Sequence, residues 1–272
     1  MKNYITTLML VLVCGALDLQ AQVNLEITSS PNFRELGGLK INDSLRIKTG
    51  KLYRSGSFSN LQEEELEKLR QTKLQTIIDF RSDFEIQRDP DHIPSGMEVE
   101  WINSPIGNLD GKGMAKFSQV LMSPEFDEES VDELMIEANR GFVQNIKDFQ
   151  PLFNALENED AIVLFHCSAG KDRTGFASSL LLHALGADWD IIMEDFLRSN
   201  EAVEKTDLSK MEAYGIPKER VKVMMGVKPE YLLAAWDEIE KKYGDADTML
   251  EKELGINEAK KERLRNILLT TD

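Results

Sequence analysis

The most informative stretch of this chain is His166-Cys167-Ser168-Ala169-Gly170-Lys171-Asp172-Arg173-Thr174-Gly175. An apolar run at 161–165 precedes it and a helical pattern beginning near Thr174 follows it, which predicts a strand, a loop and a helix in that order. A loop of this length can curl so that its backbone N–H groups point inward at one phosphate. The Cys167 sulfur would then lie beneath the phosphorus, and Arg173 would close the ring. The sequence therefore predicts a phosphate-binding loop with a nucleophile at its base.

The nucleophile in this interpretation is Cys167. A phosphate monoester repels nucleophiles, so the site must neutralise its oxygens and supply a thiolate that is stable near neutral pH. Inward N–H groups and the start of the next helix favour that anion, and Thr174 can donate a hydrogen bond to the sulfur. Arg173 offers a planar fork for two phosphate oxygens, Gly170 permits a tight turn, and His166 is expected to orient the loop through hydrogen bonds. The expected substrate contacts are Ser168, Ala169, Gly170, Lys171, Thr174 and Gly175.

The proton for the leaving oxygen has two candidate donors. Asp172 lies inside the loop beside the arginine, so its carboxyl group can reach the leaving group, and we favour it as general acid. Asp110 lies in a glycine-rich stretch that could carry an acid inward, and it stays open as the alternative. Asp79 ends an apolar strand and is expected to be a structural partner of arginines such as Arg81.

The first 21 residues have the pattern of a secretory signal peptide. Lys2 gives a positive start, an apolar segment follows, and small-residue chemistry places the cleavage after Ala21. The apolar segment is too short to span a bilayer comfortably, and a lipid-modified Cys14 is the other alternative. The sequence thus predicts an exported protein, periplasmic or secreted, whose residues 22–272 form a single domain.

Charge and cysteine content narrow the classes of partner. The formal charge is −16, and cleavage leaves it unchanged because Lys2 and Asp18 are both removed. Such an acidic chain disfavours nucleic acid and stable membrane association as partners. Cleavage also removes Cys14, so the exported protein would carry Cys167 as its lone thiol and no internal disulfide.

Hydrophobic periodicity predicts an α/β fold with a central, mostly parallel sheet, helices on both faces and a helical C-terminal region. Expected strands occupy 51–54, 76–80, 99–102 and 161–165. Expected helices include one capped by Ser59 with Gln62 or Asn60 with Glu63, and others at 131–146, from Pro151, and at 176–185, 191–197, 230–243 and 258–269. Residues 107–113 and 123–130 are expected to be loops.

With these residues in hand, the chain resembles the cysteine-dependent protein tyrosine phosphatase superfamily. Its loop is similar to the H-C-x-A-G-K-D-R-T-G loop of the bacterial tyrosine-phosphatase-like group, also called atypical lipid phosphatases. Segments 32–38, 52–56 and 78–82 are similar to further motifs of that group in the same order. The resemblance implies a phosphatase fold and hydrolysis without metal or cofactor. It places Cys167 as nucleophile, Arg173 as phosphate ligand and Asp172 as the acid of some members, and it associates Lys171 with multi-phosphate substrates.

Three functions follow from the sequence. The first is a phosphatase that acts on phosphotyrosine, and on other phosphoprotein substrates, through a phospho-cysteine intermediate. The second is a phosphatase for phosphoinositides or soluble inositol phosphates, which Lys171 favours. The third, a non-catalytic phosphate-binding module, is disfavoured because Cys167 and Arg173 are both intact.

Overall fold

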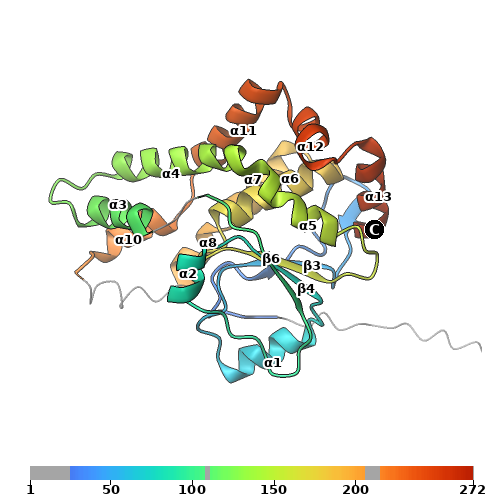
Figure 1. The fold of residues 1–272 in the computed structure, drawn as a ribbon, viewed down its shortest axis with the longest axis horizontal. Helices are drawn as coiled ribbons and strands as arrows, with labels where there is room; N and C mark the ends of the chain where they lie inside the picture. Colours follow the sequence, from blue (N-terminus) through green and yellow to red (C-terminus); the bar gives the residue numbers. More distant parts are fainter. Residues whose placement is uncertain (1–24, 108–110, 206–214, 272) are drawn as a thin grey trace, which may run out of the picture.

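The computed structural model describes residues 25–107, 111–205 and 215–271. The predicted signal peptide and Asp110 lie outside these ranges. A five-stranded sheet forms the centre of the molecule, with helices on both faces and a group of helices that projects beyond one end (Figure 1). Its strands are β1 (Arg34–Glu35), β3 (Leu52–Ser55), β4 (Thr76–Asp79), β5 (Glu100–Asn103) and β6 (Val163–His166).

The strand order is β1-β3-β6-β4-β5, and only β1 runs antiparallel to its neighbour. The predicted mostly parallel sheet and its four strands are therefore confirmed. Because β3, β6 and β4 are parallel, their carboxyl ends meet at one edge, which is where ligands bind in open α/β sheets. The phosphate-binding loop follows β6 at that edge.

Side chains alternate between the two faces of the sheet. Val163 and Phe165 of β6 join the larger apolar core, whereas Leu164 joins the smaller one. A strand that is buried on both faces has a continuous apolar sequence. The run at 161–165 therefore predicted a strand, but it did not indicate which side chains lie on which face of the sheet.

The helices form two layers and an arm (Figure 1). Helix α1 (Glu63–Gln71) covers the face with the smaller core, and α5 (Gln150–Ala155), α6 (Asp172–Leu185) and α7 (Trp189–Leu197) cover the other. The arm consists of α3 (Gly111–Met122), α4 (Glu128–Phe142) and α10 (Lys218–Met225). The remaining elements are α2 (Asp83–Arg88), η1 (Val143–Phe149), α8 (Asn200–Lys205), α11 (Pro229–Tyr243), α12 (Ala246–Leu254) and α13 (Glu258–Leu268).

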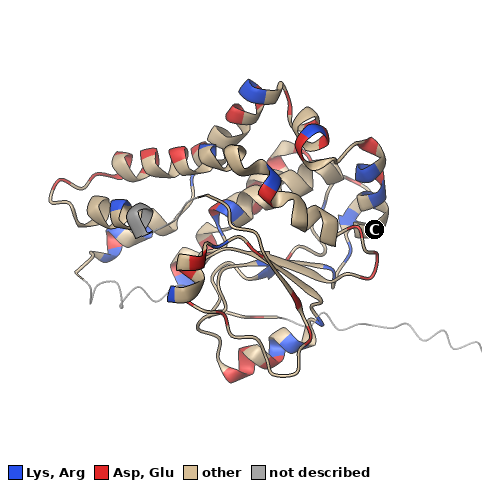
Figure 2. Cartoon of the chain, in the orientation of Figure 1, with Lys and Arg blue, Asp and Glu red and all other residues tan. Residues whose placement is uncertain are grey.

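Charged residues are distributed unevenly over the helices. Asp and Glu recur along α4, whereas Lys and Arg are interspersed along α10 and α13 (Figure 2). Within the described ranges, every helix is too short or too polar to cross a membrane.

Four helix boundaries differ from the sequence-based predictions. Helix α1 begins after Gln62, whose backbone N–H donates to Glu65 Oε2, so both predicted capping boxes were wrong. Residues 111–113 belong to α3, and α4 already begins at Glu128. The predicted loops at 107–113 and 123–130 therefore each included the first residues of the helix that follows. Helix α6 begins at Asp172 rather than near Thr174, which places Asp172 and Arg173 in its first turn.

A second, two-stranded sheet was not predicted. Strand β2 (Leu45–Ile47) pairs antiparallel with β7 (Leu269–Thr271), so the last residues of the chain pack against its N-terminal part. Strands this short carry too little periodicity to be recognised from sequence.

Candidate active site

The loop after β6 turns its carbonyl groups outward. Ser57 N–H donates to the carbonyl of Ser168 at 3.0 Å, and Asn32 Nδ2 donates to that of Ala169 at 2.9 Å. Arg54 Nη2 donates to the carbonyl of Gly170 at 2.9 Å. Because successive carbonyls are held from outside, the N–H groups on the other side of the chain are free to face the concave side of the loop, where an anion can be bound.

Gly170 makes this curl possible. Its φ of +66° lies in the left-handed region, and a Cβ there would lie 2.4 Å from the backbone carbon of Ser55. Both observations require glycine, as the sequence predicted. The loop therefore packs directly on the carboxyl end of β3.

Arg173 is buried at 5% exposure and is held by Glu85. Its Nη1 donates to Glu85 Oε2 and its Nη2 to Oε1, at 2.9 and 2.6 Å, and Nη1 also donates to the carbonyl of Phe80. A guanidinium group has five N–H donors. Among the described residues, these contacts use both Nη1 hydrogens and one Nη2 hydrogen of Arg173. The Nε hydrogen and the second Nη2 hydrogen remain for a ligand. They lie on the same edge of the guanidinium group, so they can hold two phosphate oxygens.

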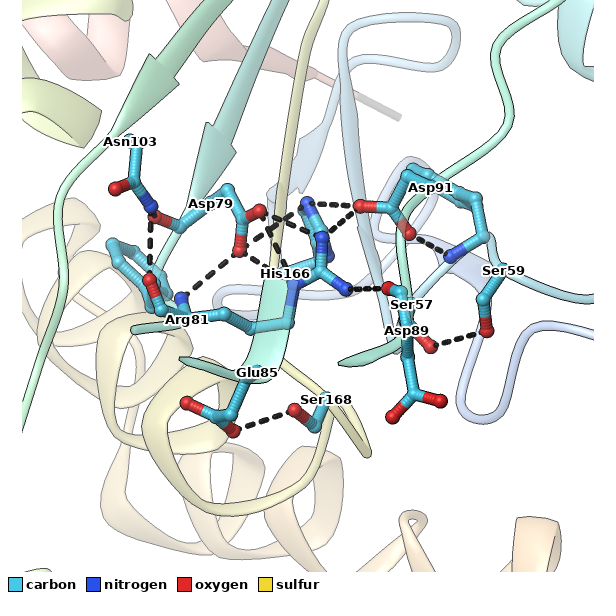
Figure 3. Close-up of polar contacts among 12 residues, drawn as sticks. Ser57, Ser59, Asp79, Arg81, Glu85, Asp89, Asp91, Asn103, His166 and Ser168 are labelled. Atoms are coloured by element: carbon cyan, nitrogen blue, oxygen red, sulfur yellow. Dashed lines mark hydrogen bonds and ion pairs between the residues drawn. The ribbon is translucent and has the colours of Figure 1, made fainter. Parts of the chain in front are cut away.

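Glu85 was not predicted as a site residue. It lies in the first turn of α2, where Ser82 caps the helix and donates to Glu85 Oε2, and its Oε1 also accepts a bond of 2.6 Å from Ser168 Oγ (Figure 3). The Ser82-x-x-Glu85 spacing was a capping signal in the sequence, but nothing local connected it to Arg173. Glu85 therefore joins the start of α2 to both ends of the phosphate-binding loop.

Burial and charge shift the pKa values of this pair in opposite directions. Burial alone would raise the pKa of Glu85, but the hydrogen bonds and charge of Arg173 lower it to about 2. Burial alone would lower the pKa of Arg173, but the charges of Cys167 and Glu85 raise it above its usual value. Both groups are therefore ionised at neutral pH.

A second buried ion cluster supports the far side of the loop. Asp195 on α7 accepts from Arg54 Nη1 at 2.5 Å, from Arg34 Nη2 at 3.1 Å and from Ser178 Oγ at 2.8 Å. Burial would raise the pKa of Asp195, but Arg54 and Arg34 lower it well below its usual value. The motifs around Arg34 and Arg54 thus hold the loop through Gly170, a role that the sequence had not revealed.

His166 is fully buried but does not act as predicted. Neither ring nitrogen has a hydrogen-bond partner within the described part of the chain. The ring instead packs against Phe58 and Trp101, with centroids 5.3 and 5.6 Å away. Its Nε2 lies 3.7 Å from Asp79 Oδ1 and from Asp91 Oδ2. His166 therefore fixes the start of the loop by packing, not by the expected side-chain hydrogen bonds.

Arg81 lies between the two aspartates beside His166 (Figure 3). Its Nη2 forms an ion pair of 2.8 Å with Asp79 Oδ2 and a second with Asp91. The predicted structural pairing of Asp79 with Arg81 is thus confirmed. Asp79, Asp91 and His166 offer ligand atoms within 4.8 Å of one another, a spacing that suits a metal ion, but both carboxylates already pair with this arginine. Burial raises the pKa of Asp91, and this outweighs the opposing charges of His166 and Arg81.

The loop segment contains three further predicted site residues, Lys171, Asp172 and Thr174. Asp172 Oδ1 is buried without a hydrogen-bond partner among the described residues, and Oδ2 lies 3.3 Å from Lys171 Nζ. Lys171 Nζ donates to the carbonyls of Met224 and Gly226 at 2.8 and 2.9 Å. Thr174 Oγ1 is buried with no partner in the described structure, so its predicted hydrogen bond to the Cys167 sulfur is absent.

A cavity of about 600 Å³ opens beside the loop, and we call it the chamber. Cys167, Ser168, Ala169, Lys171, Asp172 and Arg173 line one side of it. Residues of α3, α4 and α10 line the other side. The structure thus brings the predicted nucleophile, arginine and acid together, while Asp110 lies outside the described residues.

A thiol in a loop whose carbonyl groups are bonded from outside, together with an ion-paired arginine and an aspartate that line the same cavity, defines a cysteine-dependent phosphatase. Comparison with known proteins agrees. A sequence model of the tyrosine phosphatase family matches residues 25–270, and the chain belongs to this family.

Two curated relatives match over most of their length. A protein of Cupriavidus necator with the provisional name of tyrosine-protein phosphatase is 30% identical, over 90% of this chain and 89% of the relative. The triple specificity protein phosphatase PtpB of Mycobacterium tuberculosis is 29% identical, over 90% of this chain and 98% of the relative. Among solved structures, P. aeruginosa TpbA in complex with pTyr aligns at 16% identity and a TM-score of 0.30, over 75% of this chain and 96% of that chain.

Proposed function

We propose that this enzyme hydrolyses phosphotyrosine and other phosphoprotein esters through a phospho-cysteine intermediate. The observation that carries the proposal is the outward bonding of three successive loop carbonyls around Cys167. It supports a cradle of N–H groups that binds phosphate and favours a thiolate at the same time.

The reaction would proceed in two steps. In the first, Cys167 Sγ forms a bond to phosphorus while the bond from phosphorus to the leaving oxygen breaks, and Asp172 gives that oxygen a proton. In the second, water attacks phosphorus, the S–P bond breaks, and Asp172 takes the proton from water. Arg173 holds two equatorial oxygens throughout, with Glu85 keeping its guanidinium group in place.

The position of Asp172 supports its role as the acid, because this residue lines the chamber together with Cys167 and its buried Oδ1 has no hydrogen-bond partner among the described residues. Asp110 stays the alternative donor. The remaining loop residues up to Thr174 would contribute backbone N–H groups. The N–H group of Gly175 instead donates to the carbonyl of Lys171 at 2.9 Å within α6, so the predicted phosphate contact through Gly175 was wrong.

Hydrolysis of phosphoinositides or inositol phosphates is the second candidate. Its sequence argument was a free Lys171 cation, but that ammonium group already bonds to two carbonyls and to Asp172. The apolar side of the chamber also suits an aromatic ring better than a ring of hydroxyl groups. We therefore favour phosphotyrosine.

The test compares a phosphotyrosine peptide with a panel of inositol phosphates, using residues 22–272 with and without EDTA. We expect hydrolysis of the peptide that EDTA does not reduce and that Cys167→Ser abolishes, while inorganic phosphate still binds. Activity that survives Cys167→Ser, or that EDTA removes, contradicts the mechanism. Phosphate binding without any hydrolysis would instead indicate a non-catalytic binding module.

We also propose that residues 1–21 direct export to the periplasm or beyond. The support is the sequence pattern alone. Mass spectrometry of the protein purified from its native cells should give a chain that begins at Gln22, and an intact N-terminus would contradict this.

A further inference from the structure

The chamber is larger than its phosphate-binding end requires. Its volume of about 600 Å³ lies in the range of pockets that enclose whole drug-sized ligands, whereas a phosphate and one ring fill only part of it. The residues away from the loop that matter most are Ile106, Phe117, Met135, Phe142, Met224 and Met225. All six are apolar, so an apolar group of a ligand can be buried against them without leaving polar atoms unpaired. The chamber is also lined by four polar residues away from the loop, Arg88, Asp89, Gln144 and Asn145.

Two side chains, Lys171 and Arg220, hold the apolar wall in place through four hydrogen bonds. Lys171 donates to the carbonyls of Met224 and Gly226, at the end of α10, and so ties the phosphate-binding loop to that helix. Arg220, on the same helix, donates to the carbonyls of Leu121 and Ser123 at the end of α3. These bonds hold α10 against both the phosphate-binding loop and the end of α3.

These contacts indicate that Lys171 does not bind a second phosphate group of the substrate. Its three short contacts are all internal: two carbonyls and the carboxylate of Asp172. Only 5% of the residue is exposed. Lys171 is thus a positioning residue that sets Met224 and Met225 opposite the cysteine.

We propose that the chamber binds the apolar alcohol of long-chain alkyl monophosphates, and that the enzyme hydrolyses these esters as a further activity. The proposal rests on the proposed function, because it uses the same nucleophile and acid. The P–O bond to the alkyl oxygen breaks, Asp172 protonates that oxygen, and water then releases inorganic phosphate from Cys167. One ester and one water give one alcohol and one phosphate.

The test measures kcat/KM for butyl, hexyl, octyl and decyl phosphate below their critical micelle concentrations, with phenyl phosphate as reference. Burial of each methylene should raise kcat/KM about fourfold until the chamber is filled. A flat series, with phenyl phosphate hydrolysed and Cys167→Ser inactive, overturns the chamber assignment and leaves the proposed function standing. Failure to hydrolyse any ester overturns both.

A matched pair of variants locates the effect. Met225 lines the chamber, whereas Met122 ends α3 at 58% exposure and does not line it. We expect Met225→Gln to lower the octyl-to-phenyl ratio of kcat/KM at least tenfold and Met122→Gln to leave it unchanged. Equal chain-length dependence in the two variants would overturn the proposal even if the wild-type series rises.

Discussion

The phosphate-binding loop and the chamber meet at Cys167 but are built in opposite ways. The loop comes from ten consecutive residues, and polar contacts from Asn32, Arg54 and Glu85 hold it. The chamber's far wall comes from helices far apart in the sequence, and its contacts with a ligand are apolar.

This difference separates chemistry from selectivity. Polar contacts with strict geometry place a charge to within a hydrogen-bond length, which catalysis of phosphoryl transfer needs. Apolar surfaces tolerate ligands of many shapes and reward buried area. Changes at the loop should therefore reduce the rate for every substrate, and changes at the chamber should redistribute rates among substrates.

The largest of the substitution effects should come from Arg173→Lys. Lysine cannot hold two phosphate oxygens and both oxygens of Glu85 at once, so kcat/KM should fall roughly 10³-fold on phenyl phosphate and phosphotyrosine peptide alike. Arg140→Lys, on the exposed side of α4, is the control and should keep wild-type rates. A loss confined to one substrate class would break the proposed division of roles.

Next in size should be Asp172→Asn. Loss of the proton donor should lower kcat about 10²-fold for alkyl leaving groups, much less for nitrophenyl phosphate, and remove the basic limb of the pH profile for kcat. The same measurements on Asp110→Asn decide between the two candidates. If that variant loses the basic limb and Asp172→Asn keeps it, the assignment of the acid is wrong.

Glu85→Gln should have a smaller effect on rate, about tenfold, because Arg173 remains but is less well oriented. Its effect on stability depends on pH. The pKa of Glu85 is about 2 when folded against an ordinary 4.5, so its contribution is present above pH 4.5 and disappears as the pH falls toward 2. Denaturant unfolding should show a variant less stable by up to about 3 kcal/mol at pH 7, with the difference shrinking at low pH. A difference that stays constant with pH would contradict the ion pair.

The smallest change in rate on phenyl phosphate, only a few-fold, should follow Lys171→Gln. If Lys171 positions α10, the octyl-to-phenyl ratio of kcat/KM should fall while the ratio of inositol polyphosphate to phenyl phosphate stays the same. The reverse pattern would show that Lys171 binds a second phosphate, and that the loop as well as the chamber sets substrate selectivity.

The sequence predicted the loop well because its determinants are contiguous. Cys167, Gly170 and Arg173 lie within a short continuous segment, and the parallel strands around them have continuous apolar sequences. The partners could not be predicted, because Glu85 meets Arg173 across 88 residues and Asp195 meets Arg54 across 141. The start of α3 could not be predicted either, because Gly111 and Gly113 have low helix propensity. Packing of α3 against α4 stabilises the helix, and that contact cannot be recognised from the local sequence.

The central claim is that phosphate passes through the sulfur of Cys167. The direct measurement is rapid quenching of the Asp172→Asn variant with nitrophenyl phosphate in mildly alkaline denaturant, which leaves an S–P bond intact, followed by mass spectrometry of its peptides at the same pH. We predict one phosphoryl group on the peptide that contains Cys167, appearing with the burst of nitrophenol and absent from Cys167→Ser. A burst of product without that modification, or a phosphoryl group on another residue, would contradict the account.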